Sequence, residues 1–191
     1  MLPANVDTPR GRHLQELAQR GSQSGWSDWP MLSHNDYVLV GAIVVLYSHM
    51  DVNLRRIVEL ADDNNMLRPP WKGKTAKLTM TDIEKAVMSL DWSAENIGAL
   101  EMIAKRRGLR NMLAHFMVRR FPLEDAFLFV AINASDYERQ LGIKPRKGRL
   151  LSAVVDVDQI KRAMREIEHV QLWLGQATSQ FEIMVAKREG R

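Results

Sequence analysis

The sequence contains no cysteine. This excludes disulfide bridges, thiolate metal ligands and a cysteine nucleophile. Disulfide-free chains are typical of reducing compartments, so we expect a cytoplasmic protein. The first residues also lack the charged-then-apolar pattern of a secretory signal.

Long hydrophobic runs are missing as well. The longest apolar run, residues 37–47, is shorter than the roughly 20 residues that span a membrane, so we expect no membrane partner. The sequence has no glycine-rich phosphate loop, no Gly-x-Ser-x-Gly elbow and no His-Glu-x-x-His zinc pair. Its carboxylates show no metal-ligand spacing, and we expect neither a metal nor a cofactor.

The 191 residues are 46% apolar and carry a net charge of +4. This size and composition predict one domain, or one domain with a tail, around a real core. Positive charge is concentrated in residues 101–120 and 139–149. Their basic residues are Lys105, Arg106, Arg107, Arg110, Arg119 and Arg120, and Arg139, Lys144, Arg146, Lys147 and Arg149. Two such blocks suit a polyanion such as RNA, and the alternative is a pair of solvated faces with partners across the fold.

Residues 1–35 are rich in Gly, Ser, Pro, Asn and Gln. This composition predicts an N-terminal arm that is partly disordered, with a short helix over residues 12–20. Trp26 and Trp29 are expected to pin the arm onto the body or onto a partner. Residues 36–191 form the domain proper.

Apolar residues at helical spacing predict the helices of this domain. The first covers residues 36–65, a second ends near Leu90, a third runs from Ser93 into residues 108–116, and the last begins at Asp156. Thr81-Asp82-Ile83-Glu84 has the form of a capping box and is expected to open the second helix. Compact apolar runs at 126–132 and 150–155 predict two short antiparallel strands with a long basic connection. The predicted fold is therefore an all-α bundle with a small β-hairpin inserted before the last helix.

Residues 108–116 read Gly-Leu-Arg-Asn-Met-Leu-Ala-His-Phe. Asn111 directly follows Arg110, and His115 comes five positions after the arginine. This pattern resembles the motif of HEPN-domain proteins, which are small helical domains and often ribonucleases. In that family the motif ends a helix that lies between a long early helix and a last one. The elements predicted over residues 36–187 follow the same order, so the resemblance implies a HEPN-like helical bundle.

The resemblance implies metal-independent RNA cleavage, in which a 2′-hydroxyl attacks the neighbouring phosphorus and the 5′-oxygen leaves. By this resemblance His115 moves the proton and Arg110 stabilises the phosphate. Imidazole titrates near neutral pH, and guanidinium stays charged with a planar set of donors. Asn111 lies one helical turn before His115 and can orient the imidazole or the phosphate. The alternative for His115 is a histidine satisfied inside a helical core.

Helix geometry separates two of these residues. At 100° per residue, Arg110 and His115 point about 140° apart on an ideal helix. The length of arginine, a distortion at Gly108 or a second subunit would each resolve this. The family resemblance implies the third, a homodimer in which two motifs meet at one cleft.

The remaining candidates rest on weaker patterns. Some members of the family have an acidic residue on the first helix that approaches the motif, and by this resemblance Asp51 joins the catalytic residues. The alternative for Asp51 is an exposed helical residue. The candidate RNA-binding residues are Arg106, Arg107, Arg119, Arg120, Lys144, Arg146 and Lys147.

Two functions follow from the resemblance. The first is a metal-independent endoribonuclease that acts as a toxin or phage-defence effector, with RNA as substrate and an antitoxin protein as partner. The second is a non-catalytic HEPN module that binds RNA, a nucleotide or a partner protein such as a nucleotidyltransferase or antitoxin. The intact set of Arg110, Asn111 and His115 favours the enzyme.

Overall fold

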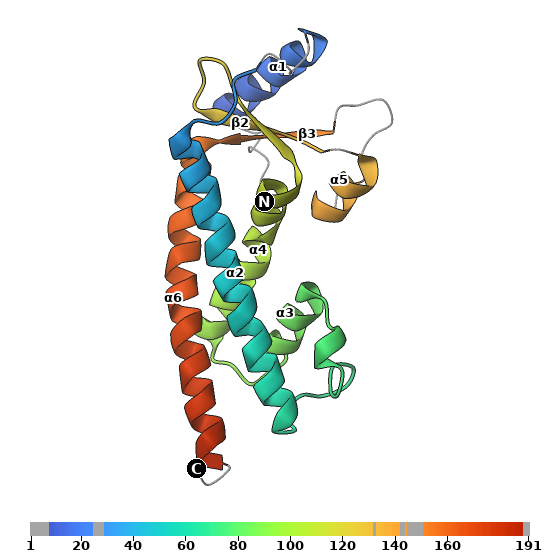
Figure 1. Cartoon of the computed structure of the whole chain (residues 1–191), viewed down its shortest axis with the longest axis vertical. Helices are drawn as coiled ribbons and strands as arrows, with labels where there is room; N and C mark the ends of the chain where they lie inside the picture. The colour runs from blue at the N-terminus through green and yellow to red at the C-terminus, as the bar shows by residue number, and fades with distance from the viewer. Residues whose placement is uncertain (1–7, 25–28, 132, 142–143, 145–150, 189–191) are drawn as a thin grey trace. The chain divides into compact units, whose positions relative to one another are not determined.

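The computed structural model describes residues 8–24, 29–131, 133–141, 144 and 151–188 (Figure 1). The chain forms two compact units, one made of residues 1–44 and 106–164 and the other of residues 45–105 and 165–191. The division falls within three long helices, α2 (His34–Asp63), α4 (Ala94–His115) and α6 (Val157–Arg188). These helices match three of those expected from the apolar spacing, so the mostly helical class is confirmed.

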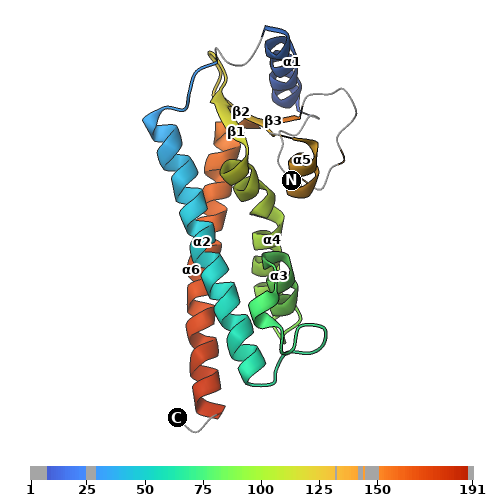
Figure 2. The same cartoon turned by 45° about the vertical axis from the view of Figure 1, so that its right-hand side comes forward.

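The first unit contains a three-stranded antiparallel sheet in the order β1-β2-β3 (Figure 2). Its strands are β1 (Met117–Arg120), β2 (Ala126–Val130) and β3 (Ser152–Asp156). The two predicted strands are β2 and β3, and their antiparallel pairing sets Leu128 opposite Val154. The predicted two-stranded hairpin is wrong in one respect, because β1 adds a third strand. β1 is a short edge strand with two arginines among its residues, so it lacks the apolar run that marks a buried strand.

Helix α1 (Pro9–Ser24) packs on one face of this sheet. It is longer than the helix predicted over residues 12–20. Its buried residues Leu14 and Ala18 join a cluster with Leu128 and Val154. Thr8 caps the helix, because its hydroxyl accepts a hydrogen bond from the Gly11 amide at 3.0 Å.

Trp29 holds the segment that follows α1. Its ring lies 4.7 Å from the ring of Phe121, at an interplanar angle of 59°. Gly21 of α1 lies directly beneath this indole, and an added Cβ there would collide with the ring. The expectation that Trp29 pins the arm is therefore confirmed within the first unit, whereas Trp26 lies outside the described residues.

The opposite face of the sheet is also buried. Phe127, Phe129 and Val155 are fully buried and alternate with the residues that face α1. A strand buried on both faces is apolar throughout, which explains why residues 126–130 form a continuous apolar run. Helix α5 (Ala134–Leu141) follows β2, in the segment that was expected to be a polar connection. Part of that connection, including residues 145–150, lies outside the described residues.

The second unit is built from parts of α2, α4 and α6 with the 3-10 turn η1 (Thr75–Lys77) and helix α3 (Met80–Met88). Leu54, Ile57, Ile83 and Leu174 are fully buried in it. The Tyr47 hydroxyl, also fully buried, donates a hydrogen bond to the carbonyl oxygen of Ile103 at 3.1 Å.

The capping box of α3 lies two residues earlier than expected. Thr79 is the N-cap, and its hydroxyl accepts a hydrogen bond from the Asp82 amide at 3.2 Å. The Asp82 carboxylate in turn accepts one from the Thr79 amide at 3.3 Å. The prediction of a box from Thr81 to Glu84 is wrong because Glu84 lies on the buried side of the helix, with 9% of its surface exposed. The sequence Thr-x-x-Asp has the same form and was available two residues upstream.

Helix α2 is long and apolar enough to cross a membrane by length and composition, the one such helix among the described residues. The core helix of a soluble protein meets the same test. One side of α2 contributes Ile43, Tyr47 and Met50 to the buried interior. Its other side leaves Val38, Val45 and Val52 more than half exposed.

Candidate functional site

The motif occupies the last turns of α4. Four apolar residues fix the orientation of this end of the helix, because their side chains are buried. They are Leu109, Met112 and Leu113 of α4, and Phe116, which directly follows the helix. The helix continues unbroken through Gly108. The helix is therefore not distorted at Gly108, and such a distortion does not bring Arg110 and His115 onto one face.

Arg110 is half-buried and bonded to its neighbour in the motif. Its terminal NH1 group donates a hydrogen bond to the Asn111 side-chain oxygen at 3.3 Å. Its Nε atom is buried and has no hydrogen-bond partner among the residues that the structure describes. A buried N–H group without an acceptor is costly, and an anionic oxygen is the acceptor that best satisfies a guanidinium. The arginine therefore has an unused donor in the motif.

His115 is the last residue of α4, and its side chain is exposed. The alternative of a histidine satisfied inside the core is therefore wrong. Asn111 lies one turn earlier, so the asparagine and the imidazole share one side of the helix. Both residues belong to α4, and on an ideal helix Arg110 points about 140° away from His115. Within one copy of the chain, Arg110 is hydrogen-bonded to Asn111, and Asn111 lies on the same side of the helix as His115.

Tyr137 of α5 reaches the end of the motif, and sequence reasoning missed it. Its ring stacks on Phe116, the residue after His115, with centroids 6.4 Å apart and an interplanar angle of 13°. Burial raises the pKa of the Tyr137 phenol above its ordinary value. The one signal in the sequence is an aromatic residue inside a polar stretch, a composition that indicates a loop.

Arg120 is occupied inside the fold rather than free for RNA. Its NH1 group lies 2.5 Å from a carboxylate oxygen of Asp36, and its NH2 group pairs with Asp125. The guanidinium also lies over the Phe127 ring, 5.3 Å from the centroid. Asp36 is 6% exposed and also accepts hydrogen bonds from the amide and hydroxyl of Ser33. This cluster links the start of α2 to the sheet.

The other predicted RNA-binding residues are dispersed. Arg119 is half-buried, with NH1 against the Met31 sulfur and a buried Nε that has no partner among the described residues. Arg106 and Arg107 are half-buried and interact with other residues. Lys144 is exposed, whereas Arg146 and Lys147 lie outside the described residues.

Asp51 does not belong to the same unit as the motif. It lies on α2 in the second unit, is half-buried and interacts with another residue. Arg110, Asn111 and His115 belong to the first unit. Within the described part of the chain, no group of three or more His, Asp and Glu side chains is placed to hold a metal ion.

Comparisons of the chain with protein-family models, with curated proteins and with solved structures gave no match. The chemistry proposed for the site therefore rests on its own residues.

Proposed function

We propose that the protein is a metal-independent endoribonuclease with a HEPN-like helical bundle. The observation that supports this most directly is the end of α4, where an exposed imidazole follows a hydrogen-bonded arginine and asparagine. An exposed imidazole is accessible to a polymer substrate. Arg110 uses one terminal nitrogen on Asn111, and its other terminal nitrogen is the group that would meet a phosphate oxygen.

The proposed reaction uses these groups in order. His115 accepts the proton of a 2′-hydroxyl, whose oxygen forms a bond to the neighbouring phosphorus. The bond from phosphorus to the 5′-oxygen breaks, that oxygen takes a proton from water, and the imidazolium of His115 returns its proton to the solvent. Arg110 stabilises the charge that develops on the phosphate oxygens. The products are a 2′,3′-cyclic phosphate end and a 5′-hydroxyl end.

A homodimer completes this proposal. Val38, Val45 and Val52 recur at seven-residue intervals along α2 and are each more than half exposed. A seven-residue apolar repeat is the pattern with which one helix packs along another. A two-fold contact brings each such residue near its own copy. In such a dimer, Arg110 of one subunit would serve the phosphate held at His115 of the other. Asp51 stays a further candidate for the active site.

The biological role is part of the same proposal. We propose that it acts in the cytoplasm as a toxin or phage-defence effector, and in the toxin role an antitoxin protein would be its partner. The basic residues that remain exposed or outside the described residues, Lys144, Arg146 and Lys147, would contact RNA phosphates.

A second function competes with cleavage. Arg110 is half-buried and Arg120 is paired within the fold, so these two arginines are less available to stabilise a developing phosphate charge. This favours a non-catalytic module that binds RNA, a nucleotide or a partner protein. Incubation with single-stranded RNA in excess EDTA distinguishes the two functions. Fragments with 2′,3′-cyclic phosphate ends support the enzyme, and intact RNA across varied substrates supports the binding module.

A further inference from the structure

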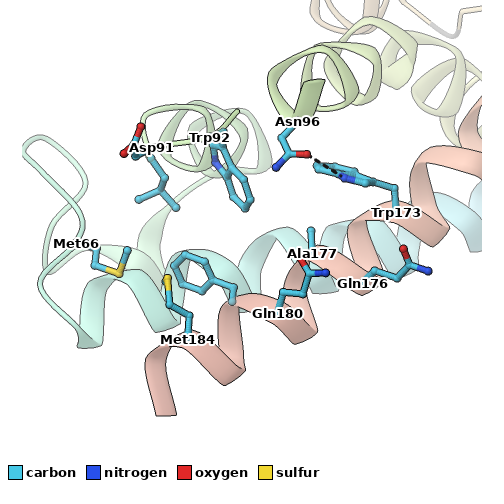
Figure 3. A pocket seen from close by; sticks show the side chains of 11 residues that line it. Met66, Asp91, Trp92, Asn96, Trp173, Gln176, Ala177, Gln180 and Met184 are labelled. Atoms are coloured by element: carbon cyan, nitrogen blue, oxygen red, sulfur yellow. Dashed lines mark hydrogen bonds between the residues drawn. The ribbon is translucent and has the colours of Figure 1, made fainter. Parts of the chain in front are cut away.

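A cavity of about 460 Å³ opens within the second unit (Figure 3). Its aromatic lining consists of Trp92, from the loop between α3 and α4, with Trp173 and Phe181 of α6. The thioethers of Met66 and Met184 lie at one end of it. This volume falls in the range of roughly 300–1,000 Å³ that is usual for small-molecule sites. None of these residues takes part in the proposed ribonuclease site.

The two indoles of the cavity are held in fixed orientations. The Nε1 group of Trp92 donates a hydrogen bond to the Val87 carbonyl oxygen at 2.6 Å. The Nε1 group of Trp173 donates one to the Asn96 side-chain oxygen at 3.2 Å (Figure 3). Both polar edges are therefore satisfied within the protein, and the indoles offer the cavity their carbon surfaces.

The three rings form a corner rather than a flat wall. The Trp92 and Trp173 centroids are 6.5 Å apart at an interplanar angle of 63°. Trp92 and Phe181 are 6.3 Å apart at 31°. With these spacings, one group in the cavity can lie within about 6 Å of the Trp92 centroid and of the centroid of one neighbouring ring, the range in which a cation is attracted to a ring.

Charge selects the kind of ligand. The lining contains no lysine and no arginine, although the whole chain carries a net charge of +4. Its one ionisable residue is Asp91, which is exposed at the rim. Such a lining repels phosphates and carboxylates, whereas it attracts a positive group that is also apolar.

We propose that this cavity binds a small organic cation bearing a methylated ammonium group, such as a quaternary ammonium compound. The methyl groups fill the apolar corner, and the positive charge faces the negative π-surfaces of the indoles. Gln176 and Gln180 line the cavity one turn apart on α6, where their amides can bond a hydroxyl group of the ligand.

The test compares choline with its neutral isostere, 3,3-dimethylbutanol, on the full chain. The indole N–H signals of Trp92 and Trp173 are followed by NMR during each titration. Choline should shift both signals and bind about tenfold more tightly than the isostere, since the charge is the only difference that matters. Equal binding of the two compounds, or no shift of either indole by choline, would overturn the proposal.

Variants identify the residues that bind. Trp173→Leu should weaken choline binding about tenfold or more, and Asp91→Asn should weaken it less. Trp173→Phe retains a ring and should retain much of the affinity. Trp71→Leu is the matched control, because Trp71 is half-buried in the same unit and does not line the cavity. A loss of binding in Trp71→Leu equal to that in Trp173→Leu would contradict the assignment.

A trimethylammonium group can come from a free solute or from a lipid headgroup. Sedimentation with phosphatidylcholine vesicles that is lost in Trp173→Leu would identify the lipid as the source. Choline binding without such sedimentation would identify a free solute. Because the readout is binding rather than RNA cleavage, failure here leaves the proposed ribonuclease unaffected, and the reverse also holds.

Discussion

The guanidinium of Arg110 donates a hydrogen bond to the side-chain oxygen of Asn111 over 3.3 Å. The bond occupies one terminal nitrogen of the arginine, while the buried Nε has no described partner. Asn111 thereby limits the movement of the cation and lies on the same side of α4 as His115. The predictions about cleavage depend on this arrangement.

Removal of the imidazole should abolish most cleavage. His115→Ala should slow the cutting of single-stranded RNA in EDTA by roughly 10²–10⁴, because the proton carrier is lost. Arg110→Ala should slow it by roughly 10²–10³ through lost stabilisation of the phosphate charge. His169→Ala, an exposed histidine on α6, is the control and should leave the rate unchanged. Full activity in His115→Ala would rule out its catalytic role.

Mixing of inactive variants tests the dimer. Arg110→Ala and His115→Ala chains, each nearly inactive, would be unfolded and refolded together. If Arg110 of one subunit serves His115 of the other, the mixed dimer keeps one complete pair and activity returns in part. Activity should stay absent if the two residues act within one chain. Sedimentation that shows only monomer at micromolar concentration would contradict the dimer directly.

Salt should weaken RNA binding if the basic blocks contact phosphates. For single strands, the logarithm of affinity should fall by about 0.7 per contact for each tenfold rise in salt. Neutralisation of Lys144, Arg146 and Lys147 together should flatten this slope. An unchanged slope would show that this segment takes no part in binding.

Arg120 should matter for stability rather than for RNA. Arg120→Met leaves the nearly buried Asp36 carboxylate without its cation and should lower the free energy of unfolding by about 1–3 kcal/mol. Adding Asp36→Asn should recover part of this loss, because the unpaired charge is removed. Chemical denaturation of the single and double variants measures the coupling. Purely additive losses would contradict a direct interaction between the two side chains.

Acid should loosen the contact of α1 with the rest of the first unit. Hydrogen bonds from Arg10, and then from His13, lower the pKa of Glu124 below its ordinary value of 4.5. The carboxylate therefore stabilises the fold fully above that ordinary value, and the contribution is lost as pH falls through the lower folded pKa. Thermal unfolding of the wild type should show this loss, whereas Glu124→Gln should be less stable at pH 7 and less sensitive to acid. Parallel curves for the two proteins would contradict it.

The sequence predicts a helix or strand correctly where the spacing of its apolar residues matches the faces that the fold buries. The helix over residues 36–65 was predictable because its apolar residues recur over many turns without a breaker. The strand over residues 126–130 was predictable because both of its faces are buried. β1 was not predictable, since an edge strand with two arginines owes its conformation to pairing with β2. Helix α5 was missed because its polar residues indicate a loop, while the stacking of Tyr137 on Phe116 is a tertiary contact.

The site was predictable in part. The positions of Asn111 and His115 on one side of a helix follow from their spacing alone. The internal pairing of Arg120 does not, because Asp36 lies far from it in the sequence and only folding brings the two together. A basic residue near a motif therefore cannot be assigned to RNA until its acidic neighbours in space are known.

The collision between a Cβ at residue 21 and the Trp29 ring has an evolutionary consequence. A side chain at residue 21 would displace the indole, and a smaller residue at position 29 would remove the reason for glycine. The two positions should therefore change together in related sequences. Related sequences that carry substitutions at both positions should hold the N-terminal helix by a contact other than that of Gly21 with the Trp29 ring.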